Sequence, residues 1–186
     1  MQEPEQHLLE RAAQGERKAQ LELYQYCYPL LISVARRYYR NTDEQMTVVN
    51  NAFVKVIQFL NTYEAGRFLS WVKRIISNEI IDEYRRNKRY NELYRFDAPV
   101  EERGYEDFQT ESIFTNEQLQ EMLLSLSEPA RLVLNLFAIE GYAHKEIAKM
   151  LGVTEETSKW HTKMARKKLK ELIIIHYEKT GRKFVG

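Results

Sequence analysis

The sequence predicts an all-α protein in which two small helical domains, residues 1–90 and 115–186, are joined by an acidic linker, residues 91–114, and the second domain contains a helix-turn-helix. The chain has 186 residues, of which 44% are apolar, enough for one medium core or two small ones. Only 7 glycines and 4 prolines interrupt it, a composition that favours long helices. Apolar residues recur every three or four positions, and no segment alternates as a half-buried strand would.

The first two helices are expected over residues 5–13 and 17–39, with Gly15 between them. Pro29 lies inside the second pattern. Because proline lacks an amide donor and crowds the preceding turn, it is expected to kink that helix or restart it.

The third and fourth helices are expected over residues 45–60 and 68–89. The third carries an apolar stripe with alternating steps of one and three residues. The fourth buries one face and ends in a basic run, residues 85–89, which opposes the helix dipole. That dipole effect is the structural alternative to a binding role for these cations.

Charge is segregated along the chain, although the formal net charge is +1. Residues 67–90 hold seven basic and three acidic side chains, and residues 141–186 hold eleven and five. Between them, residues 91–117 hold two basic and eight acidic side chains. A basic block suits a phosphate backbone, whereas a solvated helix face is the plain alternative for either block alone.

Several classes of function find no support in the sequence. No apolar run approaches the roughly 20 residues of a membrane span, and the first ten residues lack the basic start of a secretory signal. The single Cys27 cannot form an internal disulfide and fits a reducing compartment. The four histidines lack metal-ligand spacing, and neither a phosphate-binding glycine loop nor a nucleophile elbow is present. We therefore expect a cytoplasmic protein that is not an enzyme, with no metal, cofactor, small-molecule substrate or membrane insertion.

Residues 143–169 predict the helix-turn-helix. A short helix over 143–151 is followed by Gly152, which can adopt a left-handed conformation, and by Thr154, a favourable N-cap. In this motif the start of the second helix enters the major groove. A helical hairpin that never touches DNA is the alternative. The candidate base contacts are Glu156, Ser158, Lys159, His161, Thr162 and Lys163, and the candidate phosphate contacts are Arg166, Lys167, Lys168 and Lys170.

Residues 134–148, 151–159 and 165–169 closely resemble region 4 of the extracytoplasmic-function sigma factors, the promoter-specificity subunits of bacterial RNA polymerase, in the versions common in Bacteroidetes-type bacteria. The resemblance implies that this domain binds the −35 element of a promoter. The sequence departs from the family at Trp160, Thr162 and Met164, where a small residue, leucine and arginine are usual. Because of these departures, the resemblance does not determine which DNA sequence is recognised.

Residues 35–39, 52–56 and 68–86 resemble region 2 of the same family in order and spacing. The resemblance implies that the loop after the third helix, together with the fourth helix, binds and opens the −10 element. The implied contacts are Tyr63, Phe68, Trp71, Lys73, Arg74, Asn78, Asp82, Arg85 and Arg86. Aromatic faces and nearby cations can offset the cost of unstacking DNA. Alternatively, Trp71 is a core residue, Asp82 pairs with Arg85 or Arg86, and Asn78 is merely exposed.

The resemblance also implies that the third helix docks on the clamp of core RNA polymerase. The family's helix begins with an acidic run, whereas residues 44–51 contain one acid. Binding is then expected to be weak, or to depend on Val49, Asn50, Asn51, Phe53 and Val54.

The leading interpretation is an alternative sigma factor that binds core RNA polymerase and directs transcription initiation at promoter DNA. An anti-sigma factor is a candidate partner by resemblance. The alternative is a two-domain DNA-binding regulator, or a sigma-derived adaptor, that does not itself direct initiation. An enzyme with a helical substrate domain is a third and weaker interpretation.

Overall fold

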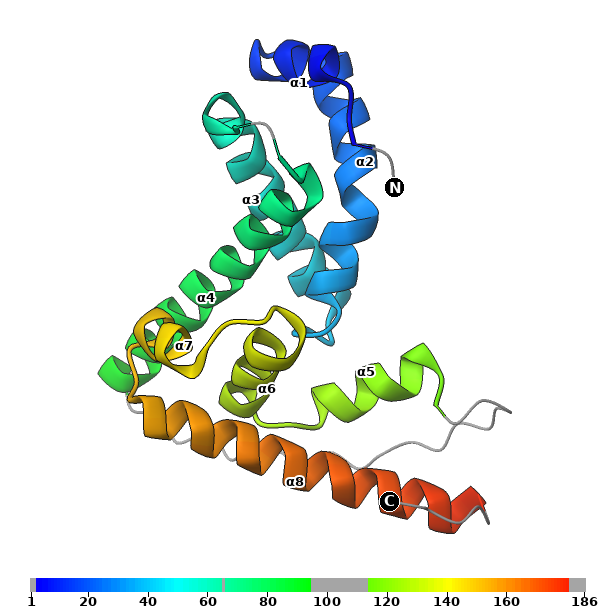
Figure 1. Cartoon of the computed structure of the whole chain (residues 1–186), viewed down its shortest axis with the longest axis vertical. Helices are drawn as coiled ribbons and strands as arrows, with labels where there is room; N and C mark the ends of the chain where they lie inside the picture. The colour runs from blue at the N-terminus through cyan, green and yellow to red at the C-terminus, as the bar shows by residue number, and fades with distance from the viewer. Residues whose placement is uncertain (1–2, 65, 95–113, 181–186) are drawn as a thin grey trace. The chain divides into compact units, whose positions relative to one another are not determined.

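The computed structural model describes residues 3–64, 66–94 and 114–180, and within these ranges every regular element is a helix (Figure 1). The all-α prediction is therefore confirmed. The elements in chain order are α1 (Gln6–Ala13), α2 (Arg17–Ala35), α3 (Thr42–Phe59), η1 (Leu60–Thr62), α4 (Phe68–Tyr94), α5 (Asn116–Leu124), α6 (Glu128–Leu134), η2 (Asn135–Ile139), α7 (His144–Leu151) and α8 (Glu155–Thr180). The chain divides into two compact units, with the boundary near residue 96.

The N-terminal unit is built on α2, α3 and α4, which pack against one another, with α1 against α2 (Figure 1). Each of the three long helices contributes one apolar stripe to the shared core. The central buried residues are Leu23, Cys27, Leu31, Val48, Ala52, Val56, Val72, Ile76 and Ile80. Burial of Cys27 raises the pKa of its thiol to about 12. This cysteine is therefore an inert core residue.

Helix α2 runs through Pro29 without restarting and ends at Ala35, earlier than the expected residue 39. Pro29 is exposed, so water can satisfy the carbonyl that loses its amide partner. Helix α3 begins at Thr42 instead of residue 45, because the Asn41 side chain accepts a hydrogen bond from the amide of Asp43 at 2.7 Å.

Helix α4 extends to Tyr94, past the expected end at residue 89 and into the predicted linker, and no glycine or proline interrupts it. Its first amide, that of Phe68, donates to the carboxylate of Glu3 at 3.0 Å. This contact ties the start of the chain to the start of α4 and satisfies one of the orphan amides there. The remainder of the predicted linker, residues 95–113, lies outside the described residues.

The C-terminal unit places α5, α6 and α7 against the long helix α8. Its small core includes Leu126, Ala130, Leu134 and Ala165. Helix α5 starts with a capping box, in which the Gln118 amide donates to the Thr115 hydroxyl at 3.1 Å and the Thr115 amide donates to the Gln118 side chain at 2.9 Å.

The predicted helix-turn-helix is present as α7 and α8. Gly152 ends α7 with φ of 65°, in the left-handed region, and the Val153 amide donates to the carbonyl of Ala148 at 3.0 Å. The Thr154 hydroxyl then accepts from the amide of Thr157 at 3.1 Å and so caps α8. The turn predicted from glycine and threonine chemistry is therefore confirmed.

Replacing Gly152 with alanine is expected to destabilise this unit by about 1–2 kcal/mol, because an L-residue is strained in the left-handed region. A Cβ at this position would meet no atom within 4 Å, so backbone strain alone sets the cost. Hydrogen exchange at the amides of α7 and α8 measures the loss, with the α2 amides as an internal control. Gly152→Asn should cost less, because asparagine tolerates this conformation. Equal protection in Gly152→Ala and the parent would contradict the prediction.

Candidate nucleic-acid interface

Three aromatic residues of the predicted −10 site meet at the start of α4. The ring centroids of Phe68 and Trp71 lie 5.2 Å from that of Tyr63 in each case, and 5.6 Å from each other. Phe68 is fully buried, whereas Tyr63 and Trp71 are half-buried. The structure therefore brings these three residues together, but Phe68 supports the other two from within the core instead of facing solvent.

The Tyr63 hydroxyl also closes the loop before α4. It donates to the carbonyl of Gly66 at 2.6 Å, and the amide of Gly66 donates back to it at 3.2 Å. These two hydrogen bonds hold the backbone of Gly66 against the aromatic cluster. A rigid aromatic edge of this kind is suited to stacking with an unpaired base.

Polar residues of the predicted −10 site follow one side of α4. Arg74, Asn78 and Arg85 are exposed and share a helix face, since they are separated by four and seven residues. Lys73 is half-buried beside them. The structure thus presents cations and an amide along the outer surface of α4, the arrangement that a polyanion requires.

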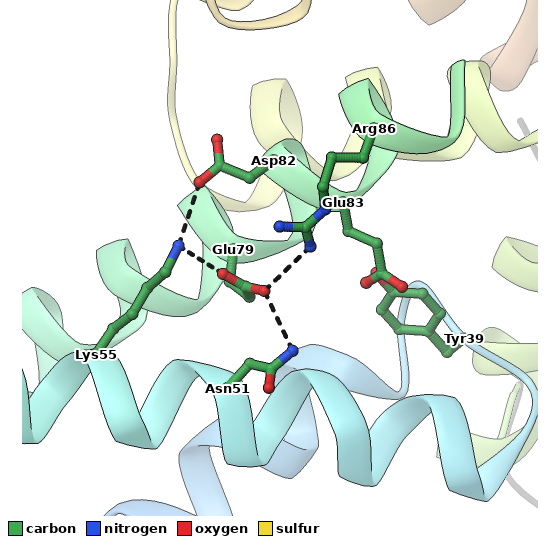
Figure 2. A network of polar contacts seen from close by, with 7 residues as sticks. All are labelled: Tyr39, Asn51, Lys55, Glu79, Asp82, Glu83 and Arg86. Carbon is green, nitrogen blue, oxygen red and sulfur yellow. Dashed lines mark hydrogen bonds and ion pairs between the residues drawn. The ribbon is translucent and has the colours of Figure 1, made fainter. Parts of the chain in front are cut away.

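A buried carboxylate joins α3 to α4 beneath this surface. Glu79 is only 3% exposed, and Figure 2 shows three side chains converging on it. Lys55 of α3 forms an ion pair with it at 2.5 Å, Arg86 lies at 3.4 Å, and Asn51 donates to it at 3.4 Å. Sequence analysis missed Glu79. The available signal was its place one helical turn after Ile76 and next to Ile80, at the edge of the apolar side of α4.

Asp82 belongs to the same network. Its carboxylate accepts from Lys55 of α3 at 3.2 Å, so its partner in this network lies on another helix and is neither of the expected arginines (Figure 2). Burial alone would lower the pKa of Lys55, but hydrogen bonds from Lys55 to Glu79 and Asp82 and the charges of those carboxylates outweigh it and raise the pKa. Lys55 therefore stays charged. Close by, the Tyr39 hydroxyl donates to Glu83 at 2.5 Å.

The residues predicted to contact polymerase differ in exposure. Val54 is 53% exposed, and Asn50 and Asn51 are also exposed. Phe53 is half-buried with its ring edge-on to Tyr24, at a centroid distance of 4.9 Å. Val49 is fully buried, so the structure places it in the core and not on the surface of α3.

In the helix-turn-helix, two of the predicted base contacts face inward. Ser158 and Thr162 are buried. The Ser158 hydroxyl lies 2.9 Å from Nδ1 of His144 on α7, and the Thr162 hydroxyl donates to the Ser158 carbonyl at 3.2 Å. These two side chains serve the packing of α8 and do not project into solvent.

The other predicted contacts remain accessible on α8. Those that are exposed are Glu156, Lys159, Lys163, Arg166, Lys167, Lys168 and Lys170, while His161 is half-buried. Lys159 pairs with Glu155 one turn earlier at 2.7 Å, and the hydrogen bond between them raises the pKa of Lys159 and lowers that of Glu155.

An aromatic stack joins η2 to the start of α7. The Phe137 ring stacks on His144 at a centroid distance of 4.2 Å, and the guanidinium of Arg166 lies 5.7 Å from the Phe137 centroid. Burial lowers the pKa of His144, and the nearby charges of Lys159 and Arg166 lower it further, with Glu155 opposing them. Burial likewise lowers the pKa of His161.

Neither a membrane span nor a metal-binding cluster is found among the described residues. No helix among them is both long and apolar enough to cross a membrane. The same part of the chain contains no cluster of three or more histidine, cysteine, aspartate or glutamate side chains that could hold a metal ion.

Comparison with known proteins identifies both units. Residues 23–90 match the family model for sigma-70 region 2, and residues 116–169 match that for sigma-70, region 4. The chain is 28% identical over 155 residues to the ECF RNA polymerase sigma factor SigE of Mycolicibacterium smegmatis, a match that covers 80% of this chain but only 59% of that protein. It is 26% identical over 175 residues to the ECF RNA polymerase sigma factor SigM of Mycobacterium tuberculosis, covering 94% of this chain and 86% of that protein.

Among solved structures, the fold is similar to that of the sigma factor RpoE from Bartonella quintana, crystallised with the anti-sigma factor NepR. The TM-score is 0.52 at 21% identity, over 83% of this chain and 96% of that one. The resemblance to Bacteroidetes-type versions stays a prediction.

Protonation of His144 and His161 is expected to destabilise the C-terminal unit in acid. Since the pKa values of His144 and His161 are lower in the folded chain than their ordinary 6.5, the unfolded chain binds more protons. The stability that the two neutral histidines contribute is fully present above pH 6.5. It is lost as the pH falls through their lower pKa values in the folded chain. Calorimetry at about pH 7.5 and about pH 5.5 should show this loss.

The double variant His144→Gln/His161→Gln should show a smaller dependence on pH than the parent. His7→Gln is the control, since that side chain is exposed in the other unit. If the double variant kept the full dependence, other groups would be responsible.

Loss of the Glu79 carboxylate is expected to destabilise the N-terminal unit by about 1–2 kcal/mol in Glu79→Ala, because Lys55, Arg86 and Asn51 lose a shared buried partner. Asp82→Ala is the matched control. Its carboxylate also pairs with Lys55 but is 45% exposed, so its removal should cost at most about 1 kcal/mol. Urea unfolding measures both, and equal costs would show that burial does not set the strength of the pair.

Proposed function

The chain belongs to the extracytoplasmic-function sigma factors, which direct transcription initiation, and from this membership we propose how its two units divide the work. The N-terminal unit binds core RNA polymerase and opens the −10 element, and the C-terminal unit binds the −35 element. The observation that carries the proposal is that sigma-70 regions 2 and 4 occur in order in one chain, each with an exposed basic helix face, on α4 and on α8.

Promoter opening is assigned to the aromatic edge of Tyr63 and Trp71, with the cation of Arg74 nearby on α4. Separating a base from its stack costs free energy, and stacking on an aromatic ring offsets part of that cost. The hydrogen bonds of Tyr63 to Gly66 support this role, because they hold the loop in place before DNA arrives.

Polymerase binding is assigned to the exposed part of α3 around Asn50, Asn51 and Val54. The polymerase supplies the chemistry of RNA synthesis, so this chain acts without being an enzyme, and its site of action is the cytoplasm. An anti-sigma factor is a further partner that we propose, because a solved sigma factor of similar fold was crystallised with one.

A regulator or adaptor that binds DNA without directing initiation is the competing function. The single acid in residues 44–51 favours it, because the family's polymerase-binding helix is usually acidic there. The match to both sigma regions over one chain favours the sigma factor.

Transcription in vitro with core polymerase, the full chain and a library of promoters from the same genome separates the two functions. A sigma factor is expected to yield discrete start sites that share two upstream motifs. Retention on core polymerase without any start site would support the adaptor, and failure of core polymerase to retain the chain at low salt would support the regulator.

Val54→Asp is expected to weaken retention on core polymerase about tenfold or more, because it places a charge in an apolar contact of α3. Leu21→Asp on α2 is the matched control. Leu21 is 58% exposed and Val54 53% exposed in the same unit, so neither change should unfold the chain. Equal retention of the two variants would remove Val54 from the polymerase interface.

A further inference from the structure

Two large apolar side chains lie exposed on the basic helix α8. Trp160 is 55% exposed and Met164 is 38% exposed. They are four residues apart, so they occupy the same side of the helix one turn from each other. Neither is among the DNA contacts assigned above.

The packing of α8 determines why these two side chains point outward. Ser158 and Thr162 are buried, and the Ser158 hydroxyl contacts His144 of α7. A step of two residues turns the helix by roughly 200°. Trp160 and Met164 are each two residues from Thr162 and therefore lie opposite the buried side. The His161 ring contacts the Trp160 indole at a centroid distance of 5.0 Å and an interplanar angle of 71°, which restricts the indole.

The surroundings of this apolar pair are cationic. Residues 155–170 contain six basic and two acidic side chains. Lys163, Lys167 and Lys168 are exposed, and each is three or four residues from Trp160 or Met164 on the same side of the helix. An apolar protein surface that covered Trp160 would also strip water from these cations, at a cost in free energy. A DNA groove supplies an apolar contact and phosphates together, so its charge complements this surface.

We propose that Trp160 and Met164 read thymine methyl groups in the major groove of the −35 element. The inference rests on the proposed function, in which α8 enters that groove. The thymine C5-methyl is the apolar group that base pairs display there. Four residues of helix advance about 6 Å along the axis, and stacked base pairs are about 3.4 Å apart. The two side chains can therefore reach thymines at neighbouring or next-neighbouring base pairs.

The test replaces each −35 thymine with deoxyuridine, which removes only the methyl group. Holoenzyme made from core polymerase and the full chain first selects its −35 sequence from a random duplex library. Binding of the selected promoter is then measured with each thymine replaced in turn. Loss of one buried methyl is expected to weaken binding about fourfold, at one position that depends on Trp160 and another that depends on Met164.

Variants assign each methyl to its side chain. In Trp160→Gln the penalty for deoxyuridine should disappear at one position, and in Met164→Gln at the other. Lys167→Gln is the control, because loss of a phosphate contact should weaken all promoters alike and leave both penalties intact. Helix content by circular dichroism checks that each variant folds, and both replaced side chains are exposed.

The outcomes separate this inference from the proposed function. Discrete start sites with no thymine at −35, no deoxyuridine penalty, or an unchanged penalty in Trp160→Gln and Met164→Gln would overturn the inference and leave the sigma factor function intact. Absence of a holoenzyme would overturn both. A penalty lost only in the matching variant would support the inference.

Discussion

The buried ion pair between Glu79 and Lys55 joins α3 to α4, and the function proposed for the N-terminal unit uses both helices. A carboxylate that is 3% exposed needs a charged partner, because an unpaired charge in a protein core is very costly. Lys55, Arg86 and Asn51 meet that need from two helices (Figure 2). The network thereby links the helix assigned to polymerase with the helix assigned to the promoter.

A comparable constraint governs the C-terminal unit. The left-handed conformation of Gly152 lets the chain turn sharply between α7 and α8. Burial of Ser158 and Thr162 fixes the rotation of α8 about its axis. That rotation selects which side chains of α8 are available to DNA in the proposed function. It places Lys163, Arg166 and Lys167 on the surface and adds Trp160, so the surface combines cations with an indole.

Sequence periodicity was sufficient to predict the helices of both units, because each long helix buries one stripe of apolar residues spaced three and four positions apart. It left Pro29 open between a kink and a restart, and α2 continues through this residue on its exposed side. It placed the end of α4 at residue 89, whereas the helix continues to Tyr94. At Pro29 the deciding factor is which face of the helix meets water, and this depends on partners that are distant in the sequence.

The sequence by itself determined the helix-turn-helix, since Gly152 and Thr154 act through local backbone and capping chemistry. It also determined the family, through residue patterns that span both units. Only the tertiary structure decided which members of those patterns face solvent. Phe68, Val49, Ser158 and Thr162 are candidate contacts by position, yet they are buried, whereas Trp160 is exposed. The physical reason is that exposure is set by the packing of neighbouring helices, and spacing along a single helix does not reveal that packing.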